Sequence, residues 1–303
     1  MSVSRAPRRL RDTDGDPAAN TSVGIRPLTN GDLDLEQADR LLTAAYRPPS
    51  WRREVEIYLR VQPDGWFVVD DGGQIVAMAG GLLYGPFCWL GLVATMPGHE
   101  RRGLATRLSA HVSEWATSRG CGTVALDASE KGRPVYERLG FRPVGETAAL
   151  IAPASLPPAT RKGPAVERID GVEEVLALDR ATFGGDRAAL LTAICEMESP
   201  RIHVIREGGG PAGYLFARER LLGPGCARDA VTAEHLVRAA LADPTYRTGV
   251  ETRLLVPMEC RYTDLLLSLG FRESRRLVHM RLGDLQLPGE RRELLAQVSF
   301  AAG

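Results

Sequence analysis

The sequence predicts an α/β protein made of two consecutive domains of similar architecture. The chain has 303 residues, about twice the length of a typical domain. A proline-rich break at residues 152–164 interrupts the apolar periodicity near the middle of the chain. The tetrapeptide Leu-Gly-Phe-Arg occurs at 139–142 and again at 269–272, each time after a short apolar helix and before a predicted strand. A duplicated domain explains this repetition.

The apolar pattern defines the elements of the first domain. Helical spacing predicts helices at 32–45, 52–60, 102–119 and 134–139. Apolar, β-prone runs predict strands near Ile25 and at 66–69, 75–84, 88–95, 124–126 and 141–151. The sequence Asp70-Asp71-Gly72-Gly73 separates two of these strands and indicates a tight hairpin, because glycine and aspartate accept positive φ angles.

The second domain repeats this order. We expect helices at 172–182 and 188–197 and strands at 202–205 and 214–217. Gly208, Gly210 and Gly213 satisfy the dinucleotide fingerprint GxGxxG, but that motif needs a helix after it. A strand follows here, so we interpret these glycines as a hairpin turn. The tail after Pro288 is predicted to contain a helix at 291–298.

Charge and cysteine usage exclude several classes of protein. The 38 basic residues balance 38 acidic ones, so we expect neither a nucleic acid nor an acidic membrane surface as partner. The five cysteines form no CxxC pair and are odd in number, which favours reduced thiols and a cytoplasmic location. The histidines form no HxxxH pattern, so we assign no metal. Residues 1–22 lack the apolar core of a signal peptide and are expected to be a disordered leader.

The segment 92–106, LVATMPGHERRGLAT, carries the clearest chemical signal. An apolar strand leads through a basic, glycine-bearing turn into an amphipathic helix. Free backbone amides and the helix dipole at such a turn suit a pyrophosphate. Gly103 and the small Ala105 allow close approach, and Arg101 and Arg102 can bind phosphate oxygens. An ordinary arginine-rich helix start is the alternative.

Taken with the rest of the first half, this segment resembles the GNAT superfamily of acyl-CoA-dependent N-acetyltransferases. The superfamily signature is Gln or Arg, two residues, Gly, one residue, then Gly or Ala. The chain matches it from the second position onward, with Glu100 at the first. The resemblance implies two tandem GNAT-like domains, each with a mixed, mostly antiparallel sheet flanked by helices. It also implies that acetyl-CoA is bound by Val93, Ala94, Thr95, Arg101, Arg102, Gly103, Leu104, Ala105, Thr106 and Ser129.

The resemblance also suggests catalytic residues. Tyr136 stands at the family's spacing before Gly140-Phe141, where its phenol would protonate the coenzyme A thiolate. Asp127, at the end of a strand, is the nearest candidate for the general base, with a structural hydrogen-bonding role as the alternative. The terminal carboxylate at Gly303 is a further candidate.

The second half resembles the family only in outline. Its counterpart of the phosphate turn, at 222–228, lacks the Arg-Gly-x-Ala core, and Leu266 replaces the tyrosine. We therefore expect an active domain at 23–151, a linker at 152–164 and a degenerate domain with a tail at 165–303, which shapes the acceptor pocket.

The predicted function is transfer of acetyl from acetyl-CoA to the primary amine of a small molecule, by a monomer or homodimer. A protein acetyltransferase and a non-catalytic acyl-CoA sensor are the alternatives.

Overall fold

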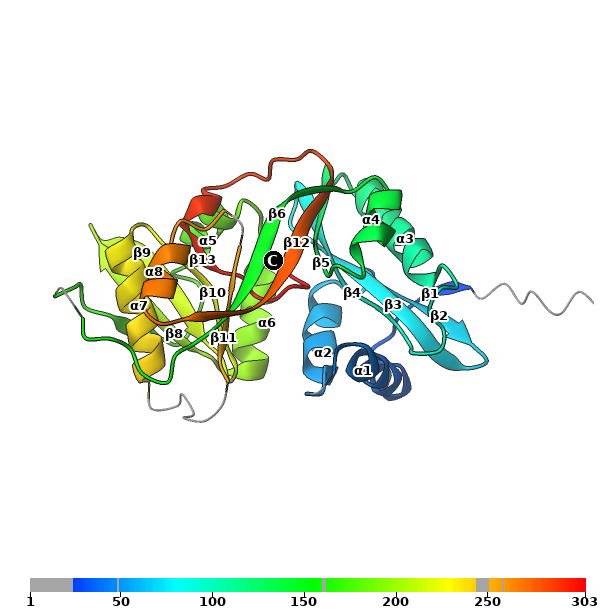
Figure 1. Cartoon of the computed structure of the whole chain (residues 1–303), viewed down its shortest axis with the longest axis horizontal. Helices are drawn as coiled ribbons and strands as arrows, with labels where there is room; N and C mark the ends of the chain where they lie inside the picture. The colour runs from blue at the N-terminus through cyan, green and yellow to red at the C-terminus, as the bar shows by residue number, and fades with distance from the viewer. Residues whose placement is uncertain (1–23, 48, 160–161, 244–250, 258) are drawn as a thin grey trace, which may run out of the picture.

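The computed structural model describes residues 24–47, 49–159, 162–243, 251–257 and 259–303, so the predicted leader lies outside the described residues. The elements of the first half are β1 (Ile25–Pro27), α1 (Asp32–Tyr46), α2 (Arg52–Val61), β2 (Trp66–Asp71), β3 (Gln74–Leu83), β4 (Phe87–Thr95), α3 (Leu104–Ser118), β5 (Thr123–Ala128), α4 (Arg133–Arg138) and β6 (Arg142–Ile151). The second half contains β7 (Glu167–Ile169), α5 (Leu176–Phe183), α6 (Ala188–Glu198), β8 (Arg201–Glu207), β9 (Gly210–Ala217), β10 (Leu221–Ala227), α7 (Ala230–Ala242), β11 (Arg253–Val256), α8 (Thr263–Ser268), β12 (Arg272–Gly283), a 3₁₀ turn η1 (Arg291–Glu293) and β13 (Leu294–Ala296). Figure 1 shows the two halves side by side.

The predicted mixed α/β architecture and its duplication are confirmed. The two Leu-Gly-Phe-Arg repeats lead directly into β6 and β12, which begin at Arg142 and Arg272. The predicted tail helix at 291–298 is wrong, because η1 and β13 occupy most of that range. Pairing of β13 with β10 overrides the local helical pattern.

Both predicted glycine hairpins are present. Asp71 pairs with Gln74 across a two-residue loop, and Gly72 and Gly73 have φ angles of 64° and 82°. The loop between β8 and β9 repeats this geometry, with Gly208 at 61° and Gly209 at 87°. Positive φ at both loop positions matches the twist of the flanking strands. The GxGxxG pattern is therefore a turn between two strands.

The two halves exchange their last strands. The described strands form one sheet in the order β1-β2-β3-β4-β5-β12-β6-β11-β10-β9-β8-β7, with β13 beside β10. β12 of the second half pairs with β5 of the first, and β6 of the first half pairs with β11 of the second, all antiparallel. Figure 1 shows β6 and β12 side by side in the middle of the molecule. The proposed domain limits of 23–151 and 165–303 thus stay a prediction about sequence units, since each unit completes the sheet of the other.

Three apolar clusters hold the sheet between helices. A central cluster joins residues of α1 and α2 to residues of α5 and α6, and therefore belongs to both halves. A second cluster packs α3 and α4 on the other face of the first half, and a third packs α7 and α8 on the second half. Burial of apolar surface in the central cluster couples the halves through their helices as well as through their strands.

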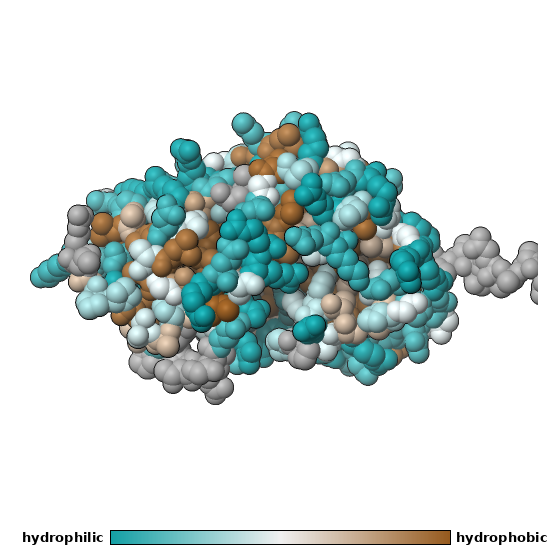
Figure 2. All heavy atoms as spheres, in the orientation of Figure 1, coloured by the Kyte–Doolittle hydropathy of each residue, from teal (hydrophilic) through white to brown (hydrophobic). Residues whose placement is uncertain are grey.

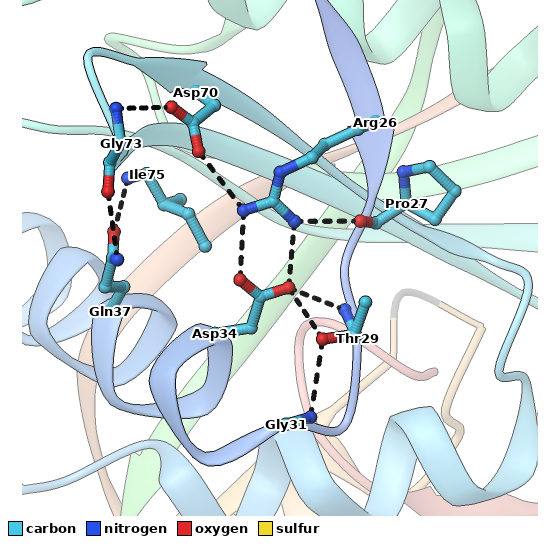
Figure 3. Close-up of polar contacts among 9 residues, drawn as sticks. All are labelled: Arg26, Pro27, Thr29, Gly31, Asp34, Gln37, Asp70, Gly73 and Ile75. Carbon is cyan, nitrogen blue, oxygen red and sulfur yellow. Dashed lines mark hydrogen bonds and ion pairs between the residues drawn. The ribbon is translucent and has the colours of Figure 1, made fainter.

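A polar network anchors α1 to the edge of the sheet (Figure 3). Both terminal guanidinium nitrogens of Arg26 on β1 donate to Asp34 on α1, at 2.8 and 2.9 Å. Gln37, one turn further, accepts from the amide of Ile75 at 2.6 Å and donates to the carbonyl of Gly73 at 3.2 Å. These contacts fix α1 across the β2–β3 hairpin, on the face where the central cluster lies.

In the part of the chain that the structure describes, no helix is long and apolar enough to cross a bilayer. On the face drawn in Figure 2 hydrophilic residues predominate and apolar residues form scattered patches.

Candidate active site

β4 and β5 separate where the sequence predicts acyl-CoA to bind. Their parallel pairing ends at Trp89 and Ala125, although β4 continues to Thr95 and β5 to Ala128. Beyond this point β4 contains a bulge, and Leu92 has a φ of 50°. No other described strand pairs with this edge of β4, so an extended ligand can lie along it, beside the Val93 carbonyl that accepts from the Tyr46 hydroxyl. The strand end consists of the predicted contact residues Val93, Ala94 and Thr95.

The loop after β4 ends at an open helix N-terminus. Gly98, Arg101 and Gly103 in this loop have φ angles of 92°, 63° and 74°. Gly103 is the N-cap residue of α3, and no side chain caps the helix. The first amides of a helix lack intrahelical acceptors, and the helix dipole makes this end positive. A Cβ on Gly103 would meet nothing within 4 Å, so an anion can reach these amides. The predicted residues Leu104, Ala105 and Thr106 form the first turn of α3.

The corresponding helix of the second half is closed. Only residues 228–229 separate β10 from α7, and the carboxylate of the N-cap residue Asp229 accepts from the amide of Thr232 at 2.8 Å. This carboxylate accepts the hydrogen bond of an amide that would otherwise be free, and it places negative charge where a phosphate would bind. The phosphate-turn counterpart predicted at 222–228 is wrong, because residues 221–227 form β10. The aspartate cap is the feature that disfavours a phosphate in this half.

Tyr136 lies close to the end of β4. It packs in one cluster with Leu104 of α3, and Val93 packs against the same cluster. Burial, and then the neighbouring phenol of Tyr46, raise the pKa of Tyr136. The Tyr46 hydroxyl donates to the carbonyl of Val93 at 2.6 Å. The structure therefore brings the predicted acid, still protonated at neutral pH, to the predicted pantetheine strand.

Three other positions of the predicted phosphate and cofactor site have protein partners. Arg102 forms an ion pair of 2.9 Å with Asp71 at the β2–β3 hairpin. Glu100, which departs from the family signature, pairs with Lys131 at 2.8 Å. The hydroxyl of Ser129 accepts a hydrogen bond from the backbone amide of Gly132, in the turn before α4, at 3.1 Å. Arg102 is thus held near the open end of α3, whereas Ser129 stabilises its own turn.

Asp127 lies on the face of β5 opposite to the cluster that contains Tyr136. Its side chain is fully buried. One carboxylate oxygen accepts from Thr147 at 2.8 Å and from Nδ1 of His279 at 2.9 Å, and the other has no partner among the described residues. Nε2 of His279 accepts from Arg281 at 3.0 Å, so the imidazole carries its proton on Nδ1. Asp127 therefore joins β5 to β6 and to the exchanged strand β12.

Sequence reasoning missed Glu54, in the first turn of α2. Its carboxylate accepts from the Tyr58 hydroxyl at 2.6 Å, and that hydroxyl lies 2.7 Å from the hydroxyl of Ser299 in the tail. Burial raises the pKa of Glu54. A carboxylate with a raised pKa is a better proton acceptor near neutral pH. No spacing in the sequence connects α2 with a tail more than 200 residues later, so only the folded chain reveals this site.

The end of the tail lies against β4. The indole of Trp89 donates to the carbonyl of Phe300 at 3.1 Å. Gly303 is buried beside the Trp89 ring, and one of its terminal oxygens accepts from Arg187 at 3.2 Å. Gly303, the other carboxylate that the sequence suggested, is thus held by a buried arginine. Among the described residues, no group of three or more His, Cys, Asp or Glu side chains is arranged to hold a metal ion.

Comparison with protein families finds a match in each half. Residues 34–141 match the acetyltransferase (GNAT) family, and residues 175–296 match an acetyltransferase (GNAT) domain. The first match contains the open helix end, Asp127 and Tyr136. The second contains the strand β13 of the tail.

Individual relatives agree with these matches. The chain is 30% identical over 166 residues to YitH of Bacillus subtilis, named an uncharacterized N-acetyltransferase. The aligned region covers 53% of this chain and 57% of that protein. It is 23% identical over 256 residues to the holothin acyltransferase of Pseudoalteromonas sp. This alignment covers 82% of this chain and 85% of that protein. A provisionally named acetyltransferase of Pyrococcus horikoshii superimposes with a TM-score of 0.82 at 21% identity, over 97% of this chain and 100% of that one. The fold of both described halves is thus shared with a solved structure.

Proposed function

Because this chain belongs to the GNAT acetyltransferase family and is an acyltransferase with two such domains in tandem, we propose that it acetylates the primary amine of a small molecule and that its first half alone binds acetyl-CoA. Acetyl-CoA supplies the thioester, whose carbonyl carbon the amine nitrogen attacks with loss of the coenzyme A thiolate.

The contrast between α3 and α7 carries this proposal. The N-terminus of α3 presents free amides behind an open approach at Gly103, and β4 and β5 separate next to it. The N-terminus of α7 is capped by the carboxylate of Asp229. A pyrophosphate gains charge-assisted hydrogen bonds at the first helix and meets repulsion at the second.

The residues around the gap have distinct roles in the proposed reaction. Tyr136 keeps its proton until the thiolate leaves and then donates it to the sulfur. Val93, Ala94 and Thr95 bind the pantetheine arm through backbone groups. Arg101 and Arg102, the Gly103 amide and the first turn of α3, from Leu104 to Thr106, bind the pyrophosphate. Ser129 contributes only through the turn that it stabilises.

Glu54 is the general base that the geometry favours for the proposed reaction. It borders the tail that reaches β4, and it is only partly buried. Asp127 was the candidate from the sequence, but its side chain is fully buried and accepts two hydrogen bonds. Those contacts support the structural role that the sequence left open for Asp127.

The tail favours a small acceptor over a protein. Phe300 and Ala301 lie against Trp89 and Gly91 of β4, so residues of the second half limit the space beside the reacting strand. A cytoplasmic location fits the five cysteines, all of which are free thiols.

The test compares two glycines with the same local geometry. Gly103 and Gly120, before and after α3, both have positive φ, and a Cβ added to either would meet nothing within 4 Å. Gly103→Leu should weaken acetyl-CoA binding at least tenfold in calorimetry, while Gly120→Leu carries the same backbone strain and should bind normally. An equal effect of both variants, or two equal binding sites per chain, would overturn the assignment. A panel of amines assayed by thiol release then identifies the acceptor.

A further inference from the structure

The gap between the central strands occurs in both halves. β10 and β11 are parallel and pair only at Leu221–Leu222 with Arg253–Leu254. A register shift in β10 follows directly, between Leu222 and Gly225, as the bulge in β4 follows its own short pairing with β5. The second half therefore keeps the cleft in which the first half is proposed to hold the pantetheine arm.

The chain's own tail fills this second cleft. β13 pairs antiparallel with β10, with Ala296 opposite Gly225 and Leu294 opposite Cys226. The next residue, Gln297, donates its amide to the carbonyl of Leu255 on β11 at 2.9 Å. The tail thus binds backbone groups of both strands that the gap would leave unpaired.

Side-chain burial shows that this contact is extensive. Leu294 belongs to the central apolar cluster and Leu295 to the cluster under α7 and α8. Successive residues of a strand point to opposite faces of a sheet, so the tail connects the cores on both faces. Both leucines are 2% exposed or less.

We propose that the cleft between β10 and β11 is a peptide-binding socket whose ligand is the chain's own segment 294–297, and that this anchored segment sets acceptor specificity in the first half. The inference rests on the proposed function for its second part. The former cofactor cleft holds a peptide strand in place of a pantetheine arm, and one acyl-CoA binds per chain.

The residues after the socket connect it to the first half. The Tyr84 hydroxyl donates to the carbonyl of Ala302 at 2.7 Å, and a Cβ on Gly91 of β4 would overlap the backbone of Ala301. The ring of Phe300 is partly exposed and lies 5.9 Å from the guanidinium carbon of Arg275 on β12. Phe300 is therefore the side chain through which the anchored tail contacts the acceptor.

Gln297 provides the test in the full-length chain. Gln297→Pro removes the amide that binds Leu255, whereas Gln297→Ala keeps it and removes a buried side-chain oxygen that has no partner among the described residues. In Gln297→Pro we expect amide hydrogens of residues 294–303 to exchange at least tenfold faster and the KM for the acceptor amine to rise at least tenfold. Acetyl-CoA affinity should stay within twofold at one site per chain. Because Gln297→Ala keeps the backbone amide, exchange of residues 294–303 and the acceptor KM should change much less in this variant than in Gln297→Pro.

The outcomes separate the socket from the proposed function. Equal exchange in the proline and alanine variants would overturn the socket, whether or not any amine is acetylated. Faster exchange with an unchanged acceptor KM would overturn the link to specificity. Absence of acetyl transfer by the wild-type chain would overturn the proposed function. Hydrogen exchange of residues 294–303 would still test whether the tail is bound in the socket. If Gln297→Pro loses acetyl-CoA binding because it does not fold, Leu295→Ala replaces it, with faster exchange of the same segment expected.

Discussion

Replacing Asp127 separates its structural role from a catalytic one. Asp127→Ala leaves the Thr147 hydroxyl and Nδ1–H of His279 buried without an acceptor. Each buried unsatisfied group costs about 1–3 kcal/mol, so the free energy of unfolding should fall by about 2–6 kcal/mol. In Asp127→Asn the amide oxygen still accepts both hydrogen bonds. That variant loses the assistance of the charge, about 1 kcal/mol, and exchanges the unpartnered carboxylate oxygen for an amide NH2 group.

The measurement combines stability and kinetics. In urea unfolding followed by tryptophan fluorescence, the free energy of unfolding should decrease from the wild type to Asp127→Asn and further to Asp127→Ala. Thiol release should show kcat of Asp127→Asn within about threefold of the wild type. Glu54→Gln, which keeps an acceptor for Tyr58, should lower kcat about 100-fold and remove the acidic limb of the pH profile, as expected for a general base. A stable Asp127→Asn protein with kcat reduced 100-fold would refute this reasoning and identify Asp127 as the base.

Two further predictions concern single side chains. Tyr136→Phe should lower kcat about 10- to 100-fold and leave acetyl-CoA affinity within twofold, because the phenol acts mainly in the transition state; unchanged turnover in the thiol-release assay would remove Tyr136 from the mechanism. The hydrogen bond from Arg26 lowers the pKa of Asp34 from its usual 3.8 to about 2. The ionised Asp34 side chain therefore stabilises the fold above about pH 4, and this contribution is lost as the pH falls toward 2. Asp34→Asn should therefore lower the free energy of unfolding by about 2 kcal/mol at pH 6, and a difference that persists at pH 2 would contradict the ion pair as its source.

The sequence predicts the local structure around the site well. The first-half helices, the glycine hairpins and the duplicated unit follow from periodicity and turn chemistry, which act over a few residues. The proposed phosphate turn and the proposed role of Tyr136 rest on motifs whose residues lie close together in the sequence. The structure has a loop before α3 and packs Tyr136 in the same cluster as Val93, while the functional roles of these residues stay predictions.

Features that depend on distant pairing could not be predicted. Nothing in the apolar pattern of β12 indicates that it pairs with β5, since any antiparallel neighbour requires the same alternation. The sequence predicts a helix in the tail because Leu294, Leu295 and Val298 have helical spacing. The tail forms a strand instead, because it pairs with β10 at the gap between β10 and β11. Glu54 was missed for the same reason, because its neighbour Ser299 belongs to that tail.

The exchange of β6 and β12 constrains how this protein folds during synthesis. Val278 pairs with Ala128, about 150 residues earlier, so β5 has no partner on that edge until nearly the whole chain has left the ribosome. Contacts of such long range slow folding and leave strand edges exposed meanwhile. The first half therefore emerges as an incomplete sheet that is open to aggregation.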